Sequence, residues 1–272
     1  MENQSLFNKT LIGMLHVQAL PGTPHNHLSM SQIIDFSLQE AEIFLDYGIN
    51  TLIIENMHDI PYLNCKVGPE ITSAMAIIAY ELKKRFSLTL GIQILAGANK
   101  EALASAFCSG ADFIRAEGFV FSHVADEGIM NSCAGQLLRY RKTIGAEHVK
   151  IITDIKKKHS AHSITADVNI VETAKAAEFF ASDGVIITGC STGVSADLTE
   201  LESVKKIVNI PVLVGSGIND KNLLSYLKYA DGLIIGSYFK KEGYWANEIS
   251  LDRVKKIVDK YQSYSSGITS TT

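Results

Sequence analysis

The sequence has no uninterrupted apolar run of about 18 residues, the length that a helix needs to cross a membrane. Its first ten residues, MENQSLFNKT, lack the basic and then apolar pattern of a secretion signal. Cysteine is scarce and forms no Cys-x-x-Cys pair, so neither a disulfide framework nor a zinc site is indicated. The four cysteines are Cys65, Cys108, Cys133 and Cys190. These absences predict a cytoplasmic protein without stable membrane insertion, whose thiols are buried and reduced.

An excess of basic residues is also missing. The formal net charge is −4, whereas a domain that binds nucleic acid is usually strongly basic, so we expect no nucleic-acid partner. Hydrophobic residues make up 46% of the chain and charged residues 20%, a balance that permits a large buried core. A length of 272 residues is normal for one (β/α)8 barrel, which needs about 250.

Short apolar runs rich in Ile, Val and Leu recur along the chain, and segments with helical spacing of apolar residues follow most of them. The runs are continuous rather than alternating, which is typical of parallel strands covered on both faces. They span residues 11–17, 51–55, 90–95, 112–116, 149–155, 184–188, 211–215 and 232–236. A doubly wound open sheet would carry a GxGxxG motif after its first strand, and the sequence has none there.

The pattern therefore predicts an α/β fold, a (β/α)8 TIM barrel, as a single domain over residues 1–272. Short polar termini are expected at residues 1–9 and 263–272. Among the helices, Asn99 is predicted to cap one whose apolar face includes Leu103 and Phe107.

Two glycine-rich segments, VLVGSGI and GLIIGSYF, follow the seventh and eighth runs, where barrels often bind phosphate. Small residues let backbone N–H groups approach an anion, and a short helix after the eighth strand would direct its positive end at it. The predicted phosphate-binding residues are Gly215, Ser216, Gly217, Gly236 and Ser237. The alternative is that these glycines serve only tight turns and close packing.

The active site of such a barrel lies at the C-terminal ends of the strands. Asp154 is the penultimate residue of the fifth run, and Lys158 and His159 lie four and five residues after it. We predict that Asp154 and His159 transfer protons and that Lys158 stabilises developing charge. Asp154→Asn should then leave melting nearly unchanged. The alternative is that Asp154 is a structural carboxylate and that residues 156–158 form a solvated basic run.

Other strand ends add polar side chains. His16, Glu55 and Asp59 are further catalytic candidates, with Glu55 facing the Asp154–His159 pair across the barrel. Glu55 could instead form a salt bridge with Arg115, and His16 could be a hydrogen-bonded core histidine. The substrate-binding candidates are Asn56, Arg115, Glu117, Thr188 and Gly189. No local spacing of metal ligands occurs, so no metal is predicted, and the sequence identifies no cofactor.

Several segments resemble the BtpA/SgcQ family. They are GMLHVQALPGTP from Gly13, IENMHDIPY from Ile54, DIKKKHS from Asp154, VIITGCSTG from Val185, VLVGSGI from Val212 and ADGLIIGSYFKKEGYW from Ala230. The resemblance runs from about Thr10 to Tyr261 and implies a (β/α)8 barrel related to phosphate-binding barrels. One lineage has a role in photosystem I biogenesis, and other members look like sugar-catabolism proteins or nucleosidases. After the fourth run the family implies a small polar RVN-like motif, whereas this chain has RAEG with Glu117.

Two functions compete at this point. The first is an enzyme that acts on a phosphorylated sugar or a nucleoside-like ligand, by proton-transfer isomerisation or by cleavage of an N-glycosidic bond. The second is a non-catalytic assembly factor that uses the barrel to hold a partner or a membrane complex. A homo-oligomer is compatible with either function. Polar residues at several strand ends favour the first, because a scaffold has no need of acid, base and anion-binding groups at one mouth.

Overall fold

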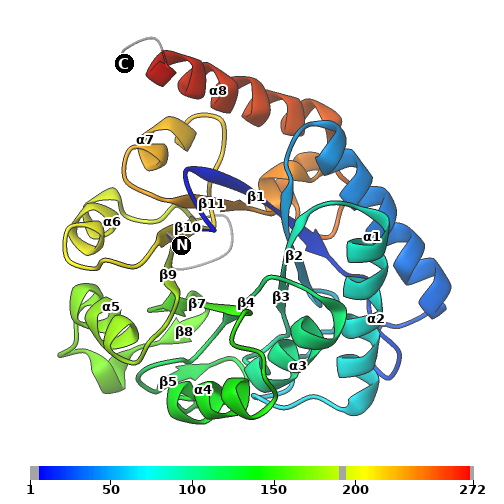
Figure 1. The fold of residues 1–272 in the computed structure, drawn as a ribbon, viewed down its shortest axis with the longest axis horizontal. Coiled ribbons are helices and arrows are strands. Elements are labelled where there is room, and N and C mark those ends of the chain that lie inside the picture. Colours follow the sequence, from blue (N-terminus) through cyan, green and yellow to red (C-terminus); the bar gives the residue numbers. More distant parts are fainter. Residues whose placement is uncertain (1–5, 190–193, 270–272) are drawn as a thin grey trace.

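The structure, a computed structural model, describes residues 6–189 and 194–269, with side chains as far as Tyr264. Eight parallel strands close into a barrel in the order β1-β11-β10-β9-β7-β4-β3-β2, and helices surround it (Figure 1). The strands are β1 (Thr10–His16), β2 (Thr51–Glu55), β3 (Thr89–Gln93), β4 (Phe113–Ala116), β7 (Lys150–Ile155), β9 (Gly184–Thr188), β10 (Val212–Gly215) and β11 (Gly232–Ile235). The predicted TIM barrel and the order of its strands are thereby confirmed.

The helices follow the strands around the barrel. They are α1 (Met30–Asp46), α2 (Pro69–Arg85), α3 (Asn99–Ser109), α4 (Ala134–Thr143), α5 (Ile170–Phe179), α6 (Leu198–Lys205), α7 (Leu223–Leu227) and α8 (Leu251–Thr269). Ser29 and Gln32 form a capping box at the start of α1. Asp197 caps α6 by accepting from the N–H groups of Thr199 and Glu200. The sequence reasoning did not assign α2 and α4.

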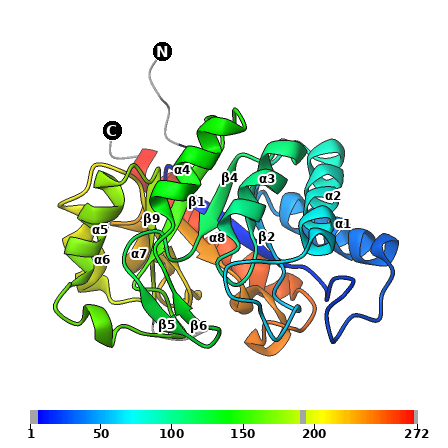
Figure 2. The same cartoon turned by 90° about the horizontal axis from the view of Figure 1, so that it is seen from below.

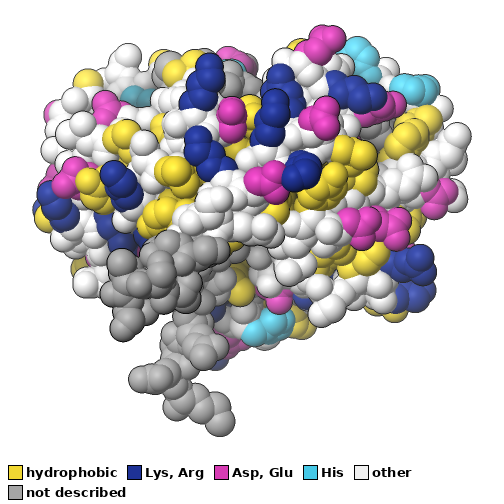
Figure 3. Space-filling model, turned by 90° about the horizontal axis from the view of Figure 1, so that it is seen from above, with side chains coloured by type: hydrophobic (Ala, Val, Ile, Leu, Met, Phe, Trp, Pro, Cys, Tyr) yellow, Lys and Arg dark blue, Asp and Glu magenta, His cyan; other side chains and the backbone are white. Residues whose placement is uncertain are grey.

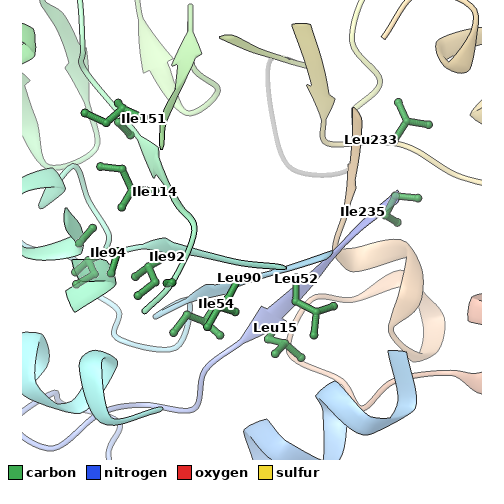
Figure 4. Close-up of a cluster of buried hydrophobic side chains, with 14 of the residues drawn as sticks. Leu15, Leu52, Ile54, Leu90, Ile92, Ile94, Ile114, Ile151, Leu233 and Ile235 are labelled. Carbon is green, nitrogen blue, oxygen red and sulfur yellow. The ribbon is translucent and has the colours of Figure 1, made fainter. Parts of the chain in front are cut away.

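The strands separate two apolar cores. The interior of the barrel contains side chains such as Ile12, Ile53, Phe113 and Ile186. The larger core lies between the strands and the helices, and Figure 4 shows Leu15 and other members of it on the outside of the strands. Because side chains alternate along a strand, the residue two positions after each of these interior side chains also faces inward. This alternation delivers polar groups to the barrel mouth.

The two ends of the chain are more structured than the sequence predicts. Phe7, placed in the polar terminus 1–9, is 3% exposed and lies inside the barrel, edge to face with Phe113 at 5.4 Å between ring centroids. Helix α8 continues to Thr269, well past the predicted start of a polar terminus at residue 263. Phe7 thus packs into the barrel from within the predicted terminus 1–9, although β1 begins directly after it at Thr10, and α8 runs on past residue 263.

A small antiparallel sheet, absent from the sequence prediction, adjoins the barrel. Its strands are β5 (His123–Ala125), β6 (Gly128–Met130) and β8 (Ser160–Ala161), in the order β6-β5-β8. It joins the segment after β4 to the segment after β7. Figure 2 shows the β5–β6 hairpin (green) at the end of the molecule where the segment after β11 (orange) also lies. The sheet thus fixes the loop that carries Lys158 and His159.

The surface and the thiols add two further observations. Among the described residues no helix is both long and apolar enough to cross a membrane. On the face drawn in Figure 3, basic and acidic side chains are interspersed. Cys65 and Cys133 are partly buried, but Cys108 is exposed, so the prediction that every thiol is buried is wrong for Cys108. Cys190 lies outside the described residues.

Candidate functional site

One inward-facing residue lies at or next to the end of each barrel strand at the mouth, two positions after another inward-facing residue. Ile53 precedes Glu55, Phe113 precedes Arg115, and Ile152 precedes Asp154. The full set is His16, Glu55, Gln93, Arg115, Asp154, Thr188, Gly215 and Gly236. The period of two therefore brings polar or small residues from all eight strands to one layer.

Arg115 and Asp154 form a buried ion pair in this layer. Arg115 Nε lies 3.1 Å from Asp154 Oδ2, and Arg115 Nη2 lies 3.1 Å from Asp154 Oδ1. The two side chains are only 6% and 2% exposed. Burial raises the pKa of Asp154, and the Arg115 guanidinium opposes that shift. The alternative that Glu55 forms a salt bridge with Arg115 is wrong, because Asp154 accepts the hydrogen bonds of the guanidinium group instead.

This pairing changes the expectation for Asp154. A carboxylate that accepts hydrogen bonds on both oxygens from a buried arginine fixes the position of that arginine. The expectation of nearly unchanged melting in Asp154→Asn does not fit such a pair. The proton-transfer role of Asp154 and His159 stays a prediction. His159 is largely exposed, and the partial desolvation of its ring, together with the positive charge of Lys158, lowers its pKa.

A second buried pair joins Glu117 to Lys157, with 3.2 Å between Oε2 and Nζ. Gln93 Nε2 donates to Glu117 Oε1 at 3.3 Å. The Asn99 side chain forms two hydrogen bonds with the Glu117 backbone. Asn99 Nδ2 donates to the Glu117 carbonyl oxygen at 2.6 Å, and the Glu117 N–H donates to Asn99 Oδ1 at 3.1 Å. Asn99 is therefore not the helix cap that we predicted; Ala98 occupies that position. These contacts hold the RAEG segment, where the sequence departs from the family pattern.

His16 and Glu55 end the neighbouring strands β1 and β2 and lie side by side in the pairing of these strands. His16 Nδ1 is 2.9 Å from the Trp245 carbonyl oxygen, so Nδ1 carries the proton and Nε2 is left as an acceptor. That Nε2 atom lies 4.0 Å from Glu55 Oε2. Burial lowers the pKa of His16 to about 3 and raises the pKa of Glu55. A neutral imidazole beside a carboxyl of raised pKa is an arrangement suited to proton transfer.

The two glycine-rich loops meet in a pocket of about 170 Å³ at the mouth. Ser216 and Gly217 from one loop and Gly236 and Ser237 from the other line it, whereas Gly215 does not. Ser216 has a φ of +73°, a conformation that costs a non-glycine residue free energy and is common at functional sites. The short helix expected after the eighth strand is two 3-10 turns, at Ser237–Phe239 and Lys241–Gly243.

Charged side chains complete this pocket. Three cations line it together with a single carboxylate, Glu55. The cations are Arg115, Lys158 and Arg253. Burial lowers the pKa of Lys158, and Arg115 lowers it further. The pocket that the glycine-rich loops form is thus electropositive, as a phosphate site requires.

A second pocket of about 370 Å³ adjoins the first. The two pockets share Glu55, Met57, Arg115 and Lys158, so they meet at the centre of the mouth. His159 and Glu117 line the second pocket only. The mouth is therefore one cleft with two compartments.

Asn56 and Asp59 line neither compartment. Asp59 accepts hydrogen bonds from the Leu20 N–H and the Asn56 side chain, each at 2.8 Å, and Asn56 Oδ1 accepts from the Leu95 N–H at 2.7 Å. Burial raises the pKa of Asp59. The two residues connect the loops that follow β1, β2 and β3, which is a structural contribution to the mouth.

Thr188 and Gly189 also line neither compartment. Thr188 is buried, and its hydroxyl has no hydrogen-bond partner among the described residues. A Cβ atom on Gly189 would lie 2.1 Å from the Val194 carbonyl oxygen. Gly189 therefore permits close packing of the segment before α6.

The sequence reasoning missed several residues of the cleft. Gln93 could have been found, because it follows Gly91 by two positions on β3 as Glu55 follows Ile53 on β2. Arg253 has no comparable signal, since it lies on α8 and only the fold brings it to the mouth. Trp245 and Lys157 line the second compartment. In the part of the chain that the structure describes, no group of three or more potential ligands is placed to hold a metal ion.

The BtpA family model matches residues 7–263. The chain belongs to the BtpA family. An uncharacterized mitochondrial protein of Caenorhabditis elegans is 52% identical over 254 residues, which cover 91% of each chain. The photosystem I biogenesis protein BtpA of Synechocystis is 30% identical over 250 residues, covering 92% of this chain and 86% of that relative.

A solved structure supports the fold assignment of this BtpA family chain. Thiamine phosphate pyrophosphorylase from Pyrococcus furiosus superimposes with a TM-score of 0.58 over 94% of this chain and 97% of its own. At 15% identity this likeness concerns the fold alone.

The cytoplasmic location stays a prediction.

A pH-dependent difference in stability is expected for Glu55→Gln. Burial raises the pKa of Glu55. Ionisation of Glu55 is therefore less favourable in the folded state than in the unfolded chain, and it lowers the free energy of unfolding. Glutamine mimics the protonated carboxyl, so the variant and the wild type should melt alike near pH 4, below the ordinary Glu pKa. The advantage of the variant in Tm should grow as the pH rises through the raised pKa.

Glu147→Gln is the matched control for that melting series. Glu147 is exposed, and its hydrogen bond with Lys142 lowers its pKa, so its replacement should bring no gain in Tm as the pH rises. A difference between Glu55→Gln and the wild type that stays constant from acid to neutral pH would contradict the raised pKa of Glu55.

Proposed function

We propose that this chain is an enzyme that binds a phosphorylated sugar or nucleoside-like molecule at the barrel mouth and acts on it by acid–base chemistry. One observation carries the proposal: both glycine-rich loops and three cations converge on the same pocket, next to a buried glutamate of raised pKa. Perturbed carboxyl groups in a cleft are typical of catalytic sites. The Pyrococcus furiosus structure, whose name refers to a phosphate ester, has the same fold and supports this reading.

The phosphate binds in the smaller compartment. The backbone of Ser216–Gly217 and of Gly236–Ser237 lines this compartment, and Arg253 and Lys158 supply positive charge. Asp154 holds Arg115 in position through two hydrogen bonds, so the guanidinium is oriented before the ligand arrives. Preorganised charge of this kind stabilises bound and developing anions.

Proton transfer takes place where the two compartments meet. Glu55 lines both, so its carboxyl contacts the part of the ligand next to the phosphate. His16 stays neutral because its pKa is about 3, and Nε2 then faces Glu55 as an acceptor. Lys158 and Arg115 stabilise negative charge that develops on the ligand. Asp154 and His159 remain the second candidate pair for proton transfer.

The name of the Synechocystis relative supports a competing role in assembly of photosystem I. Such a role needs a surface that holds a partner. The cations that converge on one pocket beside the buried Glu55 carboxyl favour the enzyme, because a scaffold has no need of acid, base and anion-binding groups at one mouth.

Titration with ribose 5-phosphate, and with inorganic phosphate alone, tests the proposed phosphate site. Both probes should bind the wild type, and Arg253→Met should weaken each by about tenfold or more, since a hydrogen bond to a charged group contributes about 1.5–3 kcal/mol. The matched control is Lys256→Met, which removes an exposed cation from the same helix. Equal affinities in the two variants, or no binding by the wild type at millimolar concentration, would contradict the proposal.

A further inference from the structure

Gln93 has a buried oxygen that lacks a partner. The residue ends β3, is 2% exposed and lines the second compartment of the cleft. Its Nε2 donates to Glu117 Oε1, but its Oε1 has no hydrogen-bond partner among the described residues. An unsatisfied buried acceptor costs about 1–3 kcal/mol, so one that lines a pocket points to a ligand donor.

The orientation of this amide is fixed by its neighbour. Exchanging the nitrogen and oxygen of Gln93 would place its carbonyl oxygen against the Glu117 carboxylate, where both atoms are acceptors. Lys157 pairs with the other oxygen of Glu117, which keeps that carboxylate ionised and in place. The unsatisfied group of this cleft-lining side chain is therefore an acceptor.

The two compartments differ in charge. Three cations and one carboxylate line the smaller compartment, which suits a phosphate. Four carboxylates and three cations line the larger one, the carboxylates being Glu55, Glu117, Asp126 and Glu127. The carboxylates of the larger compartment would repel a second anionic group on the ligand. The orientation that avoids this repulsion places the phosphate toward Ser216 and Ser237 and an uncharged end of the ligand toward Gln93.

The larger compartment also has an apolar and aromatic lining. Met57, Tyr62, Leu95 and Trp245 contribute to it. The Tyr62 hydroxyl donates to the Met57 carbonyl oxygen at 2.7 Å, which fixes that ring, and the Trp245 ring lies 4.8 Å from the ring of His58. Fixed rings and thioether side chains favour a flat, apolar group over a freely hydrated polyol.

We propose that the larger compartment binds a flat, uncharged ring whose N–H group donates to Gln93 Oε1. This inference rests on the proposed phosphate site and specifies its substrate class: a phosphorylated glycoside of a heterocycle rather than a free sugar phosphate. The sugar then lies at the junction of the compartments, against Glu55, Arg115 and Lys158. Gln93 is a specificity-determining residue of this site.

Calorimetric titration with four probes tests the inference. Ribose 5-phosphate carries no heterocyclic base. Purine riboside 5′-monophosphate carries a flat heterocyclic ring without an N–H donor, and adenosine and inosine 5′-monophosphates carry such a ring with one. The ring should strengthen binding relative to ribose 5-phosphate. At least one of the two donor-carrying probes should bind about tenfold tighter than purine riboside monophosphate, because its N–H group forms a hydrogen bond that satisfies the buried acceptor.

The variant Gln93→Met should abolish the preference for the donor-carrying probe, because methionine keeps the volume but has no comparable acceptor. Gln136→Met, on the exposed face of α4, is the matched control and should keep the preference. Wild-type affinities that are equal for ribose 5-phosphate and all three ring probes would overturn the inference and leave the phosphate site intact. If neither inorganic phosphate nor ribose 5-phosphate binds, the proposed function fails and the inference fails with it.

Discussion

Replacing Asp154 with Asn is expected to lower the free energy of unfolding by about 3–5 kcal/mol, because it leaves the buried Arg115 guanidinium without its carboxylate. In a chain of this size the loss corresponds to a fall in Tm of roughly 10 °C. Glu55 and Glu117 also interact favourably with Arg115, which places the loss toward the lower end of that range. Thermal melting and urea titration of purified variants measure the effect.

The exposed pair of Lys255 and Asp259 supplies the control. Asp259→Asn breaks an ion pair of 2.6 Å between side chains that are 61% and 57% exposed, and should change stability by less than about 1 kcal/mol. The contrary result is that Asp154→Asn melts like the wild type while ligand binding or turnover is lost. Asp154 would then be the proton-transfer group that the sequence alone predicts, and the structural role given to it here would be refuted.

Gly217→Ala is expected to destabilise the protein by about 2–4 kcal/mol, from left-handed backbone strain and overpacking together. Gly217 has a φ of +64°, and an added Cβ atom would lie 2.4 Å from the Ser195 nitrogen and the Val194 carbonyl carbon. The methyl group would displace the segment that enters α6, and phosphate affinity should fall as well. A larger residue at Gly217 is therefore expected to disturb the fold as well as the predicted phosphate site.

Gly48→Ala separates the two contributions. Gly48 has a φ of +81°, but nothing lies within 4 Å of an added Cβ atom, so only backbone strain acts there. Its loss of stability should be about 1 kcal/mol, and the excess loss in Gly217→Ala measures the steric contact. Equal losses in the two variants would show that the loop before α6 moves away freely.

The barrel and most of its mouth could be predicted from sequence because their signals are local. Near the end of each apolar run lies a residue that the period of two directs inward, so Glu55, Arg115 and Asp154 were placed correctly at the mouth. The glycine-rich loops after β10 and β11 were recognised by composition, and four of the five proposed residues line one pocket.

What the sequence could not predict depends on contacts between distant segments. Asp154 and Arg115 are 39 residues apart, and only the barrel register decides that Arg115 bonds Asp154 instead of Glu55. Phe7 sits in a polar stretch, yet the apolar barrel interior draws it in. The pairing of β5 with β8 joins two loops whose sequences show no strand-length apolar run. Arg253 reaches the pocket from α8 for the same non-local reason.

A crystal structure with ribose 5-phosphate tests the central claim most directly. The account predicts the phosphate between Ser216–Gly217 and Gly236–Ser237, within hydrogen-bond reach of Arg253, and the sugar beside Glu55. The opposite end of the barrel offers a larger pocket of about 940 Å³ that Lys150 and Lys205 line. Phosphate bound there, with the mouth empty, would contradict the account.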